Sequence, residues 1–160
     1  MEEELHILLR LGAAIACGIA IGFNRDVQDK ALGMRTLALV SMGAAIVSIA
    51  ALEYDDAVHD NADALSRVIQ GILQGVLAGI GFIGAGVILR NPARGTVEGL
   101  TTAATVWISA ALGIACALDA WLLVITGTVL AFIILQALPV IEQKALPPEV
   151  ARKKRRANRV

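Results

Sequence analysis

Five uninterrupted apolar runs set the strongest limit on what this chain can fold into. They cover residues 5–22, 36–52, 68–89, 100–118 and 120–138 of a 160-residue sequence. A helix needs about 17–25 residues to cross a hydrocarbon core of about 30 Å, and each run is close to that length. Strands of a membrane barrel would alternate with period two, which these runs do not. The sequence therefore predicts an all-α fold, a polytopic membrane bundle of five transmembrane helices.

The composition supports a membrane protein. The chain is 57% hydrophobic and only 18% charged, against about 45–50% and about 25% in ordinary globular chains. A soluble fold of this size would have more apolar surface than it could bury. This argues against a disordered, fibrous or nucleic-acid-binding domain and makes membrane lipid the expected surroundings.

The basic residues are concentrated on alternate sides of the runs. The loops after the first and third runs and the C-terminal tail hold most of the 14 Lys and Arg residues. These are Arg25, Lys30, Arg35, Arg90, Arg94, Lys144, Arg152, Lys153, Lys154, Arg155, Arg156 and Arg159. The positive-inside rule then predicts an external N-terminus and a cytoplasmic C-terminus. Residues 1–140 are the expected transmembrane domain, which Pro139 should end, and residues 141–160 a basic cytoplasmic tail on the inner leaflet.

Acidic residues gather on the opposite side, in the loop after the second run. Asp55, Asp56, Asp60 and Asp63 offer hard oxygen ligands of the kind that Mg²⁺ and Ca²⁺ bind. The loop lacks EF-hand spacing, and a hydrated acidic loop needs no ligand, so the solvated interpretation is favoured over a metal site.

Catalytic patterns are missing from the sequence. It has two histidines, no Walker lysine, no Gly-x-Ser-x-Gly and no zinc-ligand spacing. We expect a protein that is not an enzyme and has no cofactor.

The third run is rich in glycine. Gly71, Gly75 and Gly79 recur every four residues, which places them on one helix face, and Gly81, Gly84 and Gly86 follow. Bare stripes of this kind let transmembrane helices pack closely, so this run is predicted to be the central packing helix. Gln70 and Gln74 on the same run either line a polar path or, the favoured alternative, hydrogen-bond a neighbouring helix.

Three further side chains lie inside runs. Arg10 is expected to snorkel to the outer interface rather than to act in function. Cys17 should lie about 18 Å from the outer end of its helix and Cys116 within about 3 Å of the outer end of its own. That depth mismatch of about 15 Å would exclude a disulfide, whose Cα atoms are about 4.4–6.8 Å apart.

An internal repeat is suggested by a shift of 66 residues. It places residues 33–40 on residues 99–106, Gly18 on Gly84, and residues 51–52 on 117–118. The alternative is coincidence in an Ala- and Gly-rich sequence. A true repeat would relate two helix pairs by an axis along the membrane normal, because both copies have the same orientation.

Four blocks resemble a known family. They are residues 22–26 (GFNRD), 33–44 (GMRTLALVSMGA), 79–86 (GIGFIGAG) and 97–104 (VEGLTTAA). In this order and spacing they are similar to the transmembrane domain of the MgtC/SapB family, over about residues 8–135. The family's usual Gly-x-Glu-Arg-Glu is here altered at Asn24, and the stretch after Arg67 is four residues longer. The chain resembles a short form without the soluble C-terminal domain of many relatives.

The resemblance implies a function. The family belongs to the bacterial inner membrane and is linked to growth at low magnesium and, in pathogens, to virulence and survival inside host cells. It implies action through contacts with other membrane proteins, such as the ATP synthase or transport ATPases, and self-association is a further expectation. The alternative is an ion channel or transporter for a cation such as Mg²⁺. No ionisable side chain lies between the run centres, which argues against proton-coupled pumping but not against a channel.

The predicted topology brings the family-like blocks together at the cytoplasmic face. The candidate site residues there are Arg25, Asp26, Arg35, Thr36, Glu98, Thr101 and Thr102. Two helix N-termini and two arginines at one end could receive an anionic group of a partner or a phosphate. The competing interpretation, slightly favoured, is that the threonines cap the helices while both arginines pair with Asp26 and Glu98.

Overall fold

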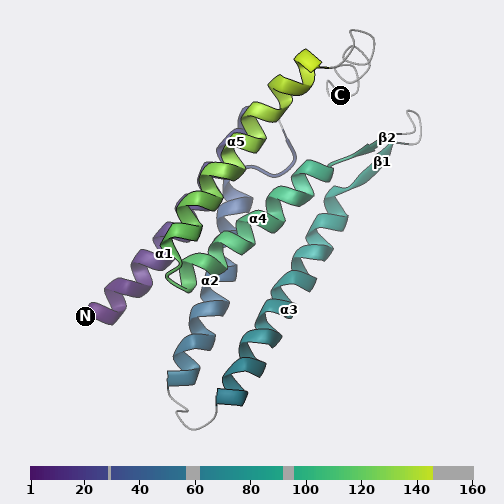
Figure 1. Ribbon diagram of the computed structural model, residues 1–160. Helices are drawn as coiled ribbons and strands as arrows, with labels where there is room; N and C mark the ends of the chain where they lie inside the picture. Colours follow the sequence, from purple (N-terminus) through teal and green to yellow (C-terminus); the bar gives the residue numbers. More distant parts are fainter. Residues whose placement is uncertain (29, 57–61, 92–95, 146–160) are drawn as a thin grey trace.

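The structure is a bundle of five helices with one short hairpin (Figure 1). The computed structural model describes residues 1–28, 30–56, 62–91 and 96–145. The elements are α1 (Glu2–Val27), α2 (Met34–Asp56), α3 (Ala62–Val87), β1 (Leu89–Asn91), β2 (Thr96–Glu98), α4 (Leu100–Ala117) and α5 (Trp121–Ala145). All five helices are long and apolar enough to cross a membrane. The predicted fold class is confirmed, whereas the orientation of the termini stays a prediction.

The two ends of the bundle differ and are named here by a residue. At the Arg25 end, α1, α3 and α5 finish and α2 and α4 begin; at the Asp119 end, α4 turns into α5. The Arg25 end also holds the antiparallel hairpin, in which Leu89 pairs with Glu98 and Asn91 with Thr96 (Figure 1). The apolar runs gave no indication of this hairpin.

The core is formed by α1, α2 and α4 packed at backbone contact. A Cβ atom on Gly18 of α1 would lie 2.5 Å from the backbone oxygen of Leu37 on α2. One on Gly113 of α4 would lie 2.8 Å from the carbonyl carbon of Ser41, also on α2. Real Cβ atoms do not approach so closely, so both contacts require glycine. Helix α4 is the most buried of the five, and α3 and α5 are the least.

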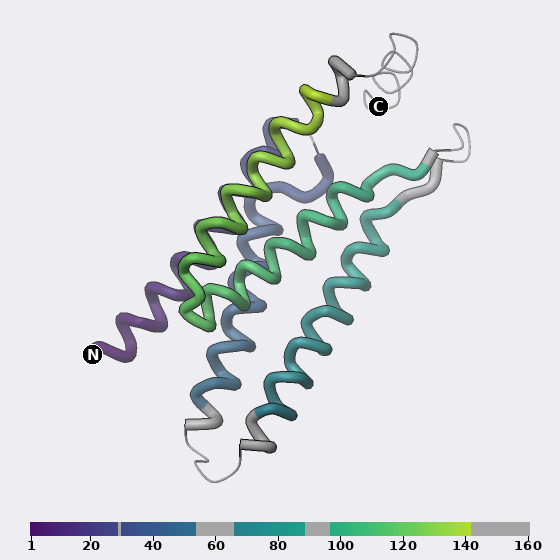
Figure 2. Tube along the Cα trace, in the orientation of Figure 1, coloured from purple at the N-terminus to yellow at the C-terminus, as the bar shows by residue number. Residues whose placement is uncertain are grey.

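Helix α3 lies at the edge of the bundle, not at its centre (Figure 2). A Cβ atom on Gly71, Gly75, Gly79, Gly81 or Gly86 would meet nothing within 4 Å. Only Gly84 faces another helix, with Ala103 of α4 at 3.6 Å. The prediction that this stripe makes α3 the central packing helix is therefore wrong within the chain. A four-residue period shows that a helix has a bare face but not which neighbour covers it.

The contacts of Gly18 and Gly84 support the internal repeat. Gly18 meets Leu37, and Gly84 meets Ala103, so both members of one contact are related to the other by the same 66-residue shift. The same shift relates the starts of α2 and α4, at Met34 and Leu100. The pairs α1–α2 and α3–α4 are thus parallel copies of one motif, as the sequence comparison indicated.

Arg10 joins α1 to the turn between α4 and α5. Its guanidinium donates to the carboxylate of Asp119 in an ion pair whose side chains are 23% and 36% exposed. Asp119 has a φ of 54°, a left-handed conformation that Asp and Asn adopt more readily than most residues. The expectation that Arg10 only snorkels to the interface is wrong, because a long-range partner completes it.

The same contact explains why the predicted depths of the two cysteines are wrong. Arg10 is level with Asp119, so α1 extends beyond that turn by about two helical turns, or roughly 12 Å. Cys17 and Cys116 therefore come within hydrogen-bonding reach of each other, and Thr128 donates to the Cys17 sulfur at 3.4 Å. Both thiols are free and buried.

Pro139 does not end the last helix. Helix α5 continues through it to Ala145. A membrane-spanning helix tolerates an internal proline where local adjustment satisfies the freed backbone group. The boundary at residue 140 stays a prediction, and the basic tail from residue 146 onward lies outside the described residues.

Candidate functional site

Arg25 is a cation buried at the C-terminal end of α1. The residue is 3% exposed, and a guanidinium nitrogen donates to the hydroxyl of Thr102 in the first turn of α4. Its Nε atom is buried and has no hydrogen-bond partner. In the described part of the chain, no carboxylate lies within 4.0 Å of it. The sequence identified this residue correctly but gave no sign of its burial.

Asp26 caps the neighbouring helix instead of pairing with an arginine. Its Oδ2 atom accepts a hydrogen bond from the backbone N–H of Met34, the first residue of α2, at 2.9 Å. A carboxylate in this place satisfies a free N–H group and complements the positive end of the helix. A Cβ atom on Gly33 would overlap this carboxylate, which explains the glycine before α2.

Helix α4 begins without a side-chain cap. Its N-cap is Gly99, at a φ of 87°, and the following hydroxyls make no capping bond. A Cβ atom on Gly99 would collide with the backbone oxygen of Val87, so glycine is needed where the hairpin meets the helix. The expectation that threonines cap the helices while Arg25 and Arg35 pair with Asp26 and Glu98 is wrong. Asp26 is already occupied as the cap of α2, and the described residues hold no such ion pair.

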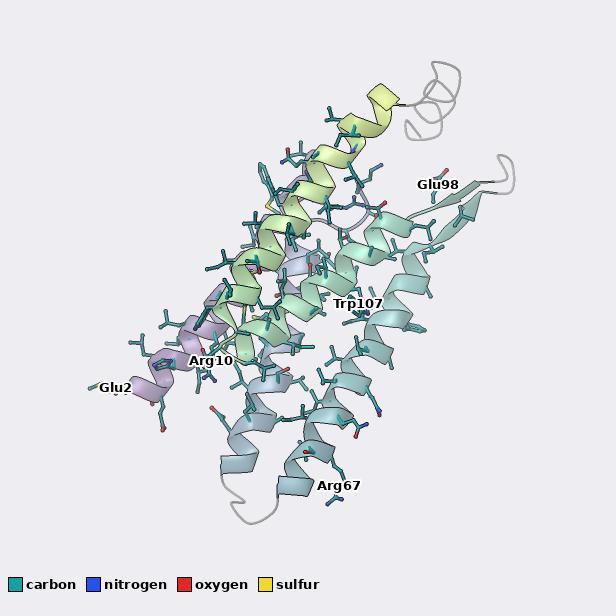
Figure 3. The ribbon with its side chains drawn as sticks, in the orientation of Figure 1. Glu2, Arg10, Arg67, Glu98 and Trp107 are labelled. Carbon is teal, nitrogen blue, oxygen red and sulfur yellow. The ribbon has the colours of Figure 1, made fainter. Side chains whose placement is uncertain are left out.

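The other candidates are close in the fold but separate in their contacts. Arg35 and Thr101 are exposed, and Thr36 is half-buried. Glu98 ends β2 at the Arg25 end (Figure 3), and its Oε1 atom is buried without a hydrogen-bond partner. The structure therefore brings Arg25 and Thr102 into direct contact and places the remaining candidates around them.

Sequence reasoning missed Asn24 as a partner and a row of hydroxyls on α4. Asn24 is buried and accepts a hydrogen bond from Gln28 at 3.0 Å. Thr102, Thr105 and Ser109 are buried at positions spaced by three and four residues, and Thr105 donates to the Thr102 carbonyl at 2.7 Å. That spacing was a readable signal for one polar face on the helix.

The acidic loop after α2 adds no metal site. The side chains of Asp55, Asp56, Asp60 and Asp63 lie outside those that the structure describes. Within the described ranges, no three His, Cys, Asp or Glu residues gather as metal ligands would. The candidate metal residues stay an untested expectation.

Comparison with known proteins places this chain in a family. It matches the MgtC family over residues 11–144. The chain belongs to the MgtC family. It is 41% identical to Protein SrpB of Synechococcus elongatus over 133 residues, which are 79% of this chain and 71% of SrpB. No solved structure matches it.

Two further relatives of this MgtC-family protein carry informative names. The putative magnesium transporter YhiD of Escherichia coli is 39% identical over 85% of this chain, and Protein MgtC of Salmonella typhimurium is 35% identical over 81%. The matched region spans 61% of YhiD and 52% of MgtC. These matches support a multi-pass membrane protein linked to magnesium.

The geometry gives Arg35 a testable role. It is the second residue of α2, is exposed, and has no ion-pair partner within the described residues. Its repeat counterpart is the uncharged Thr101, so the shared scaffold does not require a cation here. We expect Arg35→Lys to keep membrane abundance but to impair growth of the host in low magnesium, because lysine cannot form a forked contact. Arg35→Ala should impair growth at least as much.

Two measurements check this expectation. Growth in low magnesium is scored beside immunoblots of the membrane fraction. Normal growth of the lysine variant would remove Arg35 from the site, and a fall in abundance would show that its role is structural.

Proposed function

We propose that this MgtC-family protein is a non-enzymatic protein of the bacterial inner membrane that acts in magnesium homeostasis and stress or intracellular survival. In this proposal it acts by binding other membrane proteins, and α3 is the binding helix. The observation that carries the proposal is the bare glycine face of α3, which touches nothing else in the chain.

A face of this kind is suited to another helix. Five glycines of α3 have open space where a side chain would be, so a partner backbone can approach closely. Gln70 and Gln74 are exposed on the same helix and can hydrogen-bond across such a contact. The α1–α2–α4 core needs no help from this face, because its own glycines already bring its helices together.

The second candidate is transport of a cation such as Mg²⁺, which the name of the relative YhiD favours. The buried hydroxyls of α4 would be its polar lining. Two features argue against it. Backbone contacts at Gly18 and Gly113 close the space between α1, α2 and α4, and the buried guanidinium of Arg25 would repel a divalent cation at that end.

Site-specific cross-linking tests the proposal. A photoreactive amino acid at position 75 is compared with the same group at Ile134, an exposed residue of α5. In cells grown at low magnesium, position 75 should capture a transport ATPase or an ATP synthase subunit, whereas position 134 should capture lipid. Gly75→Leu should abolish low-magnesium growth without changing the abundance of the protein.

Three results would contradict the proposal. Capture of lipid alone at position 75 would remove α3 as a binding helix. Capture of the chain itself alone would make the face a homo-oligomer contact. Magnesium flux into liposomes that contain only the purified chain would favour the transporter.

A further inference from the structure

Arg25 lacks the negative charge that a buried guanidinium needs. The residue is 3% exposed, and its one hydrogen bond in the described part of the chain is to the neutral hydroxyl of Thr102. Its buried Nε–H donates to nothing. Removing a charge from water without a counter-charge costs several kcal/mol, so buried arginines are ordinarily paired.

The surroundings of the guanidinium are themselves positive. Thr102 is the third residue of α4, so Arg25 points at the N-terminal turn of that helix. A helix N-terminus carries about half a positive charge and N–H groups without intrahelical acceptors. No side chain caps this end, because its N-cap is Gly99. Two unneutralised positive features therefore meet at one point.

The nearby carboxylates do not supply the missing charge. Asp26 accepts from the Met34 N–H and serves α2. Glu98, which directly precedes Gly99, has a buried oxygen without a partner, yet it makes no ion pair with Arg25 in the described part of the chain. The vacancy at Arg25 is therefore for an anion from outside the chain.

We propose that the Arg25 end binds one phosphate-class oxyanion, held between the guanidinium of Arg25 and the first turn of α4. A tetrahedral oxyanion accepts hydrogen bonds from a guanidinium and from helix N–H groups at the same time. Inorganic phosphate and the phosphodiester of an anionic lipid both provide this group. The site is independent of any partner of α3.

Thermal unfolding of the purified full chain tests the site. The protein is held in a neutral, phosphate-free detergent and titrated with sodium phosphate against sodium chloride of equal ionic strength. A second arm compares short-chain phosphatidylglycerol with short-chain phosphatidylcholine. A ligand that binds only the folded state raises the melting temperature. We expect a saturable rise in at least one arm, and the arm that responds identifies the source of the phosphate.

Variants locate the response. Arg25→Gln should abolish it, and Arg25→Lys should raise the half-saturating concentration about tenfold or more, because lysine loses the forked geometry. The matched control is Lys30→Gln, which removes a cation from the same end and should saturate as the wild type does. If Arg25→Gln fails to fold, Thr102→Val keeps the side-chain volume and should weaken the response several-fold.

Native mass spectrometry of the same samples counts bound phosphate or lipid, with one per chain expected. A response no greater than that to chloride and phosphatidylcholine would overturn the proposal. So would variants of Arg25 or Thr102 that saturate as the wild type does.

Discussion

Replacing Gly113 with alanine is expected to destabilise the bundle strongly. The new methyl group would lie 2.8 Å from the carbonyl carbon of Ser41 and still closer to its oxygen. Both atoms belong to the backbone of α2, so the helices must move apart, and overpacking of this kind costs about 1–3 kcal/mol or more. The measurement is the melting temperature of the purified protein in detergent.

The matched control is the same substitution on α3. A methyl group at Gly75 would meet nothing within 4 Å, and alanine is the better helix former by about 0.5–1 kcal/mol. Gly75→Ala should therefore leave the melting temperature unchanged or raise it. Two identical substitutions should thus have opposite signs. Equal losses at both positions would mean that α3 packs inside the chain after all.

The second large effect is expected at the Arg10–Asp119 ion pair. Arg10→Met leaves a half-buried carboxylate without its partner, and Asp119→Asn leaves the guanidinium without its own. Asparagine is chosen at position 119 because it tolerates the left-handed backbone there. Each single variant should lower the melting temperature, and the double variant should be no worse than the weaker single one.

A double-mutant cycle measures the coupling. Contacting residues typically couple by about 0.5–3 kcal/mol, whereas independent sites add within about 0.5 kcal/mol. Additive losses would show that the two side chains act separately, as snorkelling of Arg10 alone would require.

The fold was predictable from the sequence because span length is a property of each segment by itself. Five runs of sufficient length gave five helices. Relations between segments were harder to predict. The depth of Cys17 depended on how far α1 extends past Asp119, and the Arg10 contact that sets this joins residues 109 positions apart. The packing role of Gly113 was equally hidden, since a single glycine in an apolar run has no periodicity to detect.

The candidate site was predicted in place but not in its contacts. Charge sorting and the family-like blocks brought Arg25, Asp26 and Thr102 to one end, and the structure confirms that proximity through the Arg25–Thr102 bond. The expected partners were wrong, because hydrogen-bond pairing depends on side-chain direction. Asp26 turns to the N–H of Met34, eight residues onward, which spacing alone does not indicate.

The repeat has an unequal ending that bears on stoichiometry. The 66-residue shift carries Arg25 onto Asn91, but the two copies diverge there: α1 continues to Val27, whereas α3 stops at Val87 and the chain turns into β1. A duplicated helix pair would ordinarily provide two equivalent places for a ligand. Here the hairpin replaces the second one, so each protomer should take up a single anion, and its titration should show one class of site without cooperativity.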